Sequence, residues 1–141
     1  MEPAFIETYR HDGEGYIPFF IRDHWQVAQL NYMREQGLTG IEKMDKHLLT
    51  DEVFVLLRGT AVLIAAEEDG RGFHFQCVLM KPGITYNIPV NVWHNIAMDK
   101  QAEVIIIEKS NTHLGDFIYK PLNDAEKLAL NARIHGVQKG P

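Results

Sequence analysis

The chain has little cysteine and no long apolar run, and each absence excludes a class of protein. Cys77 is the only cysteine among 141 residues, so no internal disulfide can form. The longest apolar runs, such as residues 53–57 and 104–107, fall far short of the roughly 20 residues that cross a bilayer. The first residues show neither the basic nor the apolar region of a signal peptide. We therefore expect a cytoplasmic protein that does not bind a membrane.

Basic charge is also scarce. The formal net charge is -5 and the two signs are interspersed, so no basic surface for a phosphate backbone is expected and nucleic-acid binding is disfavoured. No internal repeat or low-complexity segment occurs. At this length, folding one domain over residues 1–141 buries roughly two thirds of the unfolded surface, which is enough for a core. The partner that this composition favours is a small molecule.

Apolar and polar residues alternate over much of the chain with the period of two that is typical of β-strands. Turn signals at residues 58–59, 67–70 and 82–83 separate these stretches, as in an antiparallel meander. The expected strands cover residues 16–22, 25–32, 53–57, 60–66, 73–80, 84–88, 93–97 and 102–109. Residues 34–40 and 111–120 are expected to be irregular. The sequence therefore predicts an all-β domain up to about residue 120.

The last segment changes to a helical period. Asn123 and Glu126 have the spacing of a capping box, and apolar residues then recur at helical spacing. Gly136 is a typical stop signal. The pattern predicts one helix over about residues 124–135, with a frayed end after it.

The stretch from residue 45 to residue 59 carries the first candidate site. Because side chains alternate along a strand, Asp45 and His47 point to one face, and Glu52 and Phe54 can rejoin that face after a short turn. Gly59 ends the stretch where the chain must reverse, since glycine adopts a positive φ without strain. Three candidate metal ligands therefore converge.

This stretch resembles the first motif of the cupin superfamily, G-x5-H-x-H-x3-4-E-x6-G. His47, four residues, Glu52, six residues and Gly59 match the last two thirds of that motif. The difference lies at the first histidine of the family, where this chain has Asp45. A carboxylate is still a competent metal ligand, and it favours a hard divalent ion.

A second stretch resembles the other cupin motif, G-x5-P-x-G-x2-H-x3-N. Gly83, Pro89 and His94 stand at the family's spacing. Asn91 replaces the central glycine, and asparagine tolerates the left-handed backbone better than most residues. Met98 replaces the last asparagine. Together the motifs span about residues 45–98, and two half-motifs in the right order are more specific than either alone.

The resemblance implies a double-stranded β-helix, or jelly-roll barrel, with a metal inside. Carried over residue by residue, the ligands are His47, Glu52 and His94, with Asp45 in the fourth position. Two imidazoles and one carboxylate leave open positions on Fe, Mn, Ni or Zn. Such a site suits an enzyme for a small polar organic molecule, with Tyr86 or Asp45 as the group that moves a proton. Oxygenase, isomerase and lyase chemistry remain open.

Two alternatives use the same barrel. In the first, no metal binds, His47 and Glu52 satisfy each other, and the interior holds or transforms a sugar-type molecule. In the second, the chain is a non-catalytic binding module whose pocket is lined by aromatic residues; the candidates are Trp25, Phe54, Tyr86 and Trp93. Small barrels often pair edge strands across a two-fold axis, so we expect a homodimer through the N-terminal strands.

The remaining titratable side chains have structural interpretations. Cys77 shares a strand face with Phe75, which indicates a small core residue and not a nucleophile. His74 lies on the opposite face and is expected to face solvent. His24 and His113 fall in predicted turns or loops and are expected to be exposed.

Overall fold

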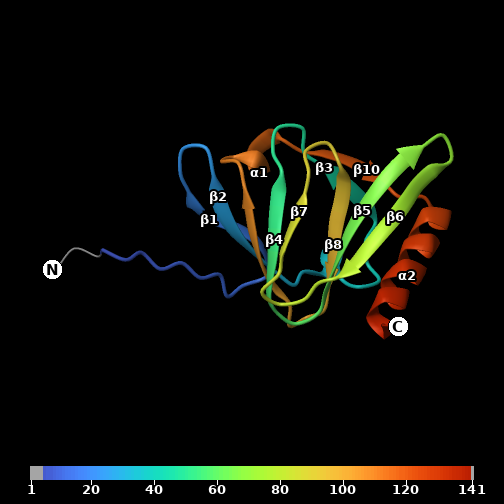
Figure 1. The fold of residues 1–141 in the computed structure, drawn as a ribbon, viewed down its shortest axis with the longest axis horizontal. Coiled ribbons are helices and arrows are strands. Elements are labelled where there is room, and N and C mark those ends of the chain that lie inside the picture. The colour runs from blue at the N-terminus through green and yellow to red at the C-terminus, as the bar shows by residue number, and fades with distance from the viewer. Residues whose placement is uncertain (1–4, 141) are drawn as a thin grey trace.

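The computed structural model describes residues 5–140, whose strands form two antiparallel sheets (Figure 1). The first sheet has the strand order β1 (Gly15–Ile21), β2 (Gln26–Asn31), β9 (Glu103–Glu108), β4 (Glu52–Arg58) and β7 (Thr85–Ile88). The second has the order β10 (Ile118–Pro121), β3 (Lys43–Lys46), β8 (Trp93–Met98), β5 (Ala61–Asp69) and β6 (Gly72–Leu79). Strands distant in the sequence are thus neighbours, and the fold is an all-β jelly roll with a C-terminal helix, as predicted.

The main error in the predicted elements concerns residues 111–120, which are not irregular throughout. They contain α1 (Thr112–Gly115) and the start of β10, which pairs with β3 so that Tyr119 lies opposite Asp45. All residues of β10 are exposed, so no alternation of buried side chains could reveal the strand in the sequence. Its backbone pairing with β3 holds it in place. A short 3-10 helix, η1 (Arg34–Gln36), interrupts the other predicted loop.

The structure has two apolar cores, an inner core between the sheets and an outer core on the far face of the second sheet, and strand β5 contributes to both. Ala61 and Leu63 point into the space between the sheets, whereas Val62 and Ile64 point to the outer face of the second sheet. The inner core also contains Phe54, Leu56 and Ile96, and the outer core contains Phe73, Phe75, Leu130 and Ile134. Because both faces are buried, this strand reads as a continuous apolar run.

Helix α2 (Asp124–Lys139) covers the outer core beside β6 (Figure 1). The predicted capping box is confirmed: the Asn123 side chain accepts from the Glu126 amide at 2.8 Å, and the Asn123 amide donates to the Glu126 carboxylate at 3.0 Å. The predicted stop at Gly136 is wrong. The helix continues past it because Ile134 is buried and Val137 packs on the outer core, which outweighs the cost of about 1 kcal/mol for a helical glycine.

The N-terminal part leads to an edge of the first sheet. Residues 5–14 run outside the sheets and are mostly exposed, with Phe5 at 93% and Ile6 at 82% exposure. β1 lies at one edge of the first sheet, and the predicted pairing with a second copy of the chain would use that edge. This pairing stays a prediction. Residues 1–4, which entered the signal-peptide argument, lie outside the described residues. Within residues 5–140, no helix combines the length and the apolar character needed to cross a membrane.

Candidate metal centre

The first sheet presents one polar row on its inner face. The register places Glu108 of β9 directly between Glu52 of β4 and Gln26 of β2, and all three residues are buried. The next row on this face is apolar and buried: Ala28, Ile106 and Phe54. The polar groups are therefore concentrated at one end of the inner core.

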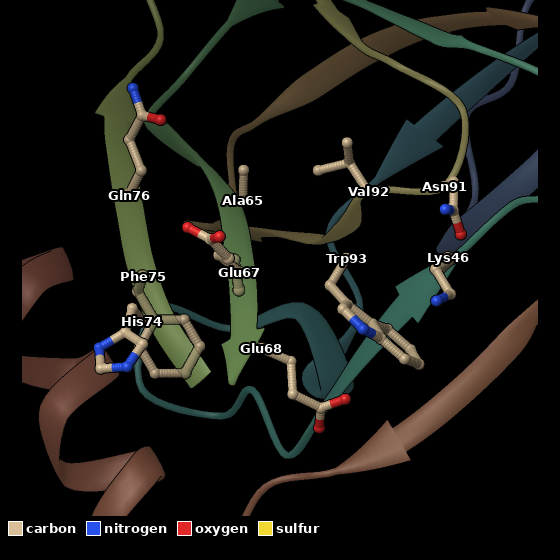
Figure 2. A pocket seen from close by; sticks show the side chains of 11 residues that line it. Lys46, Ala65, Glu67, Glu68, His74, Phe75, Gln76, Asn91, Val92 and Trp93 are labelled. Atoms are coloured by element: carbon tan, nitrogen blue, oxygen red, sulfur yellow. The ribbon is translucent and has the colours of Figure 1, made fainter. Parts of the chain in front are cut away.

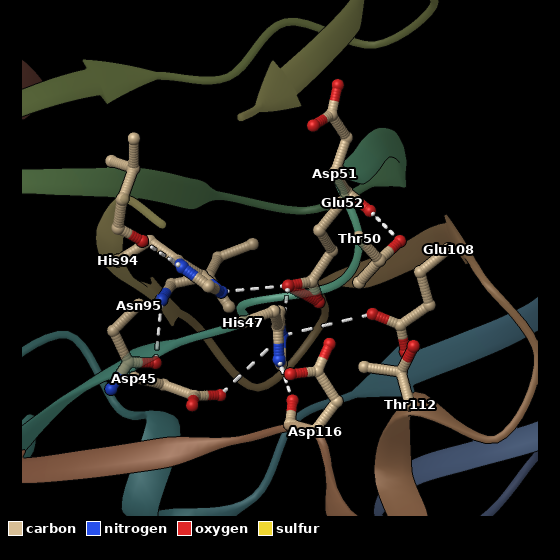
Figure 3. A network of polar contacts seen from close by, with 12 residues as sticks. Asp45, His47, Thr50, Asp51, Glu52, His94, Asn95, Glu108, Thr112 and Asp116 are labelled. Atoms are coloured by element: carbon tan, nitrogen blue, oxygen red, sulfur yellow. Dashed lines mark hydrogen bonds and ion pairs between the residues drawn. The ribbon is translucent and has the colours of Figure 1, made fainter. Parts of the chain in front are cut away.

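The second sheet supplies the opposite side of the site. Asp45 of β3 is the register partner of His94 of β8, and His47 follows directly after β3. The structure thus brings together the four residues proposed as ligands, His47, Glu52, His94 and Asp45 (Figure 3).

Backbone carbonyls orient both imidazoles. His47 Nδ1 donates to the Asp116 carbonyl at 2.5 Å, and His94 Nδ1 donates to the Val92 carbonyl at 2.9 Å. Each ring therefore keeps Nε2 for the interior. These two nitrogens lie 3.0 and 2.8 Å from the same oxygen, Oε2 of Glu52. A second ring nitrogen fixed by a carbonyl is typical of histidines that bind metals.

The turn after His47 is held by residues from the other end of the chain. The Asp116 carboxylate accepts hydrogen bonds from the backbone amides of Leu48 and Leu49 at 2.9 and 3.0 Å. Asp116 therefore fixes this imidazole through its carbonyl and the following loop through its side chain. No local pattern predicts this role, because the contact joins residues about seventy positions apart.

The ionisation states of Glu52 and His47 follow from these contacts. Burial alone raises the pKa of Glu52, but the hydrogen bonds from His47 and His94 outweigh burial and lower that pKa. Burial lowers the pKa of His47, yet the hydrogen bond and the charge of Glu52 outweigh it and raise the pKa to about 9. Glu52 is therefore ionised at neutral pH, with an imidazolium beside it when no metal is bound.

Asp45 lies beside the two imidazoles, as the fourth member of the candidate ligand set. Its Oδ2 lies 3.8 Å from His47 Nε2, and its buried Oδ1 has no hydrogen-bond partner among the described residues. Burial raises the pKa of this carboxyl group. An unpaired carboxylate oxygen beside two ring nitrogens is suited to a cation, which would satisfy it. Ligand atoms at right angles around an ion lie about 3 Å apart for bonds of about 2.1 Å, close to the Glu52 distances above.

Glu108 is the acidic residue that sequence reasoning missed. Its Oε1 accepts from the Tyr16 hydroxyl at 2.7 Å and from the Gln26 amide at 3.2 Å. Its Oε2 lies 3.9 Å from His47 Nε2. Burial, followed by the charge of Glu52, raises the pKa of Glu108 to about 7. Alternation in β9 could have found it, because Glu108 continues the buried face of Val104 and Ile106.

These side chains line a cavity of about 320 Å³ between the sheets. Phe54, a candidate lining residue of the binding-module alternative, lines it and also belongs to the inner core. His113 was predicted to be exposed, which is wrong: it is half-buried, lines the cavity, and has Nδ1 3.2 Å from the Gln26 amide nitrogen. Tyr86 does not line it, since its hydroxyl accepts a hydrogen bond from the Lys81 amide at 3.0 Å. Trp25 and Trp93 also lie outside its lining.

Solved structures with a similar arrangement of strands identify the fold. A cupin-2 domain protein from Shewanella frigidimarina is 20% identical over 70% of this chain and 84% of its own, with a TM-score of 0.51. The Neisseria meningitidis protein NMB1881 is 18% identical over 70% of this chain and 89% of its own, also at 0.51. A variant of Streptomyces PAC13, solved with uridine, is 11% identical over 86% of this chain and 93% of its own, at 0.57.

This chain has the cupin fold. No family model and no curated protein matches it. The predicted fold class is confirmed, and the candidate ligands lie inside the cupin barrel. These structural likenesses show the fold alone, so any function has to be argued from the residues of this site.

A second hollow lies at the outer end of the β5–β6 hairpin (Figure 2). Trp93 lines it, with the Lys46 ammonium 4.5 Å from its ring centre. His74 also lines it and is exposed, as predicted, with Nε2 2.8 Å from the Asp69 carboxylate. Among residues 5–140, no cluster with metal-ligand spacing falls in this hollow. Within this part of the chain, the candidate metal ligands therefore lie in the cavity between the sheets.

Cys77 gives a prediction that tests its structural interpretation. The side chain packs on the outer core, and burial raises the pKa of its thiol to about 11. Since only the thiolate is nucleophilic, iodoacetamide at pH 8 should alkylate folded protein about a hundredfold more slowly than urea-unfolded protein. The folded rate should still rise tenfold per pH unit above pH 9. Mass spectrometry would measure both rates, and equal rates would show that the thiol is not protected.

Proposed function

We propose that this cupin binds one divalent metal ion through His47, Glu52 and His94, with Asp45 as the fourth ligand, and that it is an enzyme for a small polar organic molecule. The observation that carries the proposal is that Asp45 brings a buried carboxylate oxygen, which has no hydrogen-bond partner among the described residues, to the two imidazoles that converge on Glu52 inside the barrel. Iron, manganese, nickel and zinc all accept such a donor set.

The residues around the proposed ion have separable tasks. A bound divalent ion would act as a Lewis acid on a substrate oxygen or water. The Asp116 and Val92 carbonyls keep both rings in the tautomer that a ligand needs. Glu108 is placed to accept or return a proton within the cavity, and so is Asp45 if it is not a ligand. Tyr86, the other group proposed for this task, does not line the cavity, and its hydroxyl accepts a hydrogen bond from the Lys81 amide.

A metal-free binding protein is the second candidate, and one observation favours it. Glu52 already contacts both imidazoles, so the central group is satisfied without an ion. This arrangement does not satisfy the buried Oδ1 of Asp45 or the buried Oε2 of Glu108. Of these two oxygens, the one on Asp45 lies beside the imidazoles, where a bound ion would satisfy it, and this is the reason for preferring the metal-bound protein.

Metal content decides between the two candidates. Protein purified without chelators, incubated with Mn²⁺ or Zn²⁺ and desalted should retain close to one equivalent by elemental analysis. At a hundredfold excess over the dissociation constant, the ion should stabilise the fold by about 2.7 kcal/mol. Retention below about a tenth of an equivalent would contradict the metal proposal, because a site with this many protein ligands should hold its ion through desalting.

A further inference from the structure

The ligand set proposed above leaves one buried carboxylate oxygen without a partner, Oε2 of Glu108. The residue ends strand β9, beyond both cupin motifs, and its side chain is only 3% exposed. Its Oε2 has no hydrogen-bond partner among the described residues. A buried carboxylate oxygen is normally satisfied by a hydrogen-bond donor or by a cation. A group that enters the cavity should therefore satisfy this oxygen.

The position of this oxygen fits a metal ligand. Glu108 Oε2 lies 3.9 Å from His47 Nε2, and Asp45 Oδ2 lies 3.8 Å from the same nitrogen on a different side (Figure 3). Two atoms bonded to one ion at about 2.1 Å are at most about 4.2 Å apart, and both pairs fall within this limit. Among the described residues, His47, Glu52 and Glu108 form a group whose ligand atoms all lie within 4.8 Å of one another. An ion bound to His47 is therefore within reach of Glu108.

Hydrogen bonds to the other oxygen hold the Glu108 side chain in this orientation. The Tyr16 hydroxyl donates to Oε1 at 2.7 Å, and the Gln26 amide donates to it at 3.2 Å. Gln26 is itself fixed, because its Oε1 accepts from the Asn111 backbone amide at 2.8 Å. Carboxylates that bind metals are commonly oriented by such hydrogen bonds. Oε2 is thus the oxygen of Glu108 that stays free for an ion.

The charge balance of the cavity favours the same assignment. A histidine must be neutral to bind a metal, so the two imidazoles contribute no positive charge once an ion is bound. Asp45, Glu52 and Glu108 line the cavity, and none of the described residues that line it is lysine or arginine. A divalent ion is then the cation that balances these acids. Carboxylate ligands favour a hard ion such as Mn²⁺.

We propose that Glu108 is a further ligand of the ion, bound through Oε2, and that its carboxylate raises the affinity of the site for Mn²⁺ more than for Zn²⁺. Neither cupin motif reaches residue 108, so the motifs do not predict this ligand. The inference rests on the proposed function, because it assigns a ligand to the ion proposed there. Glu108 would not accept a proton on Oε2 while that oxygen holds the ion.

Glu108→Gln tests this assignment in the full chain. Chelator-treated protein would be titrated with MnCl₂ and with ZnCl₂ in competition with a chelating dye. Glutamine keeps the size of the side chain but removes its charged oxygen. We expect the dissociation constant for Mn²⁺ to rise by more than about tenfold, and by a factor at least about five times larger than that for Zn²⁺.

The comparison of the two ions distinguishes a ligand from a nearby charge. Mn²⁺ and Zn²⁺ carry the same charge, so a carboxylate that acts only through space would strengthen the binding of both by the same factor. Equal factors for the two ions would therefore overturn the proposal, and so would unchanged dissociation constants. The matched control is Glu67→Gln, which removes an acid from the outer hollow (Figure 2) and should leave both constants within about twofold.

Tyr16→Phe tests the orientation of the ligand. It removes the hydroxyl that donates to Glu108 Oε1, so the dissociation constant for Mn²⁺ should rise about tenfold. When Glu108 is already glutamine, the same change should add less than about twofold, whereas a purely structural effect would act in both backgrounds. If Glu108→Gln is not folded by circular dichroism, Tyr16→Phe decides alone, and unchanged Mn²⁺ binding would overturn the proposal.

Failure of this inference and failure of the metal proposal give different results. Wild-type protein that retains its ion, together with a folded Glu108→Gln variant that binds both ions as the wild type does, would overturn the role of Glu108. The ligands His47, Glu52 and His94 would then stand. Wild-type protein that retains no ion would overturn both proposals, because Glu108 would have no metal to bind.

Discussion

His94→Ala is expected to abolish the retention of a divalent metal. His94 is buried and supplies a ring nitrogen 2.8 Å from Glu52 Oε2, and alanine leaves the proposed ion without one of its two imidazoles. Changes outside the ligand shell of metal sites already cost about 10–100-fold in affinity, so loss of a ligand should exceed about a hundredfold. Elemental analysis after desalting would measure it.

The matched control for this variant is His74→Ala. His74 is also a strand histidine paired with a carboxylate, but it is exposed and lies in the outer hollow. It should retain metal as the wild type does. The fold of His94→Ala, checked by circular dichroism, should persist because Glu52 keeps its contact with His47. Wild-type metal content in folded His94→Ala would show that the ligand assignment is wrong.

Gly59→Ala is expected to be among the most destabilising single changes outside the site. Gly59 has φ +80°, and a Cβ there would lie 2.5 Å from the backbone nitrogen and Cα of Ala102. A left-handed backbone costs alanine about 1–2 kcal/mol, and relieving the clash adds about 1–3 kcal/mol. Urea unfolding should therefore show a loss of about 2–5 kcal/mol.

Gly83→Ala separates these two causes. Gly83 has nearly the same φ, +82°, but a Cβ there would meet nothing within 4 Å. Its cost should be the backbone strain alone, about 1–2 kcal/mol. Equal losses for both variants would mean that the close approach to Ala102 relaxes without cost, and that φ alone requires glycine at position 59.

Much of the fold could be predicted from local patterns. Alternation located the strands from β4 to β9 within a few residues, because one or both faces of each are buried against a core. The capping box located the start of α2, since its hydrogen bonds involve residues only three positions apart. β10 was missed because it buries no side chain, and the end of α2 was missed because packing of Ile134 overrides Gly136.

The candidate site was predicted only in part. His47, Glu52, His94 and Asp45 were found because two motifs with fixed spacing carry them, and the structure brings these residues together. Glu108, Tyr16 and His113 were not found. Each reaches the cavity from a segment without a motif, and Glu108 becomes a neighbour of Glu52 only through the register of β9 against β4.

By itself, the amino-acid sequence determined the strand periods, the turns at Gly59 and Gly83 and the residue types of the proposed ligands, because these depend on neighbours along the chain. The tertiary structure alone decided that Glu108 faces His47 and that Asp116 orients its ring. It also placed two buried carboxyl oxygens that have no hydrogen-bond partner among the described residues, Asp45 Oδ1 and Glu108 Oε2, in one cavity. These contacts join residues far apart in sequence, and the register between strands that sets them has no local signature.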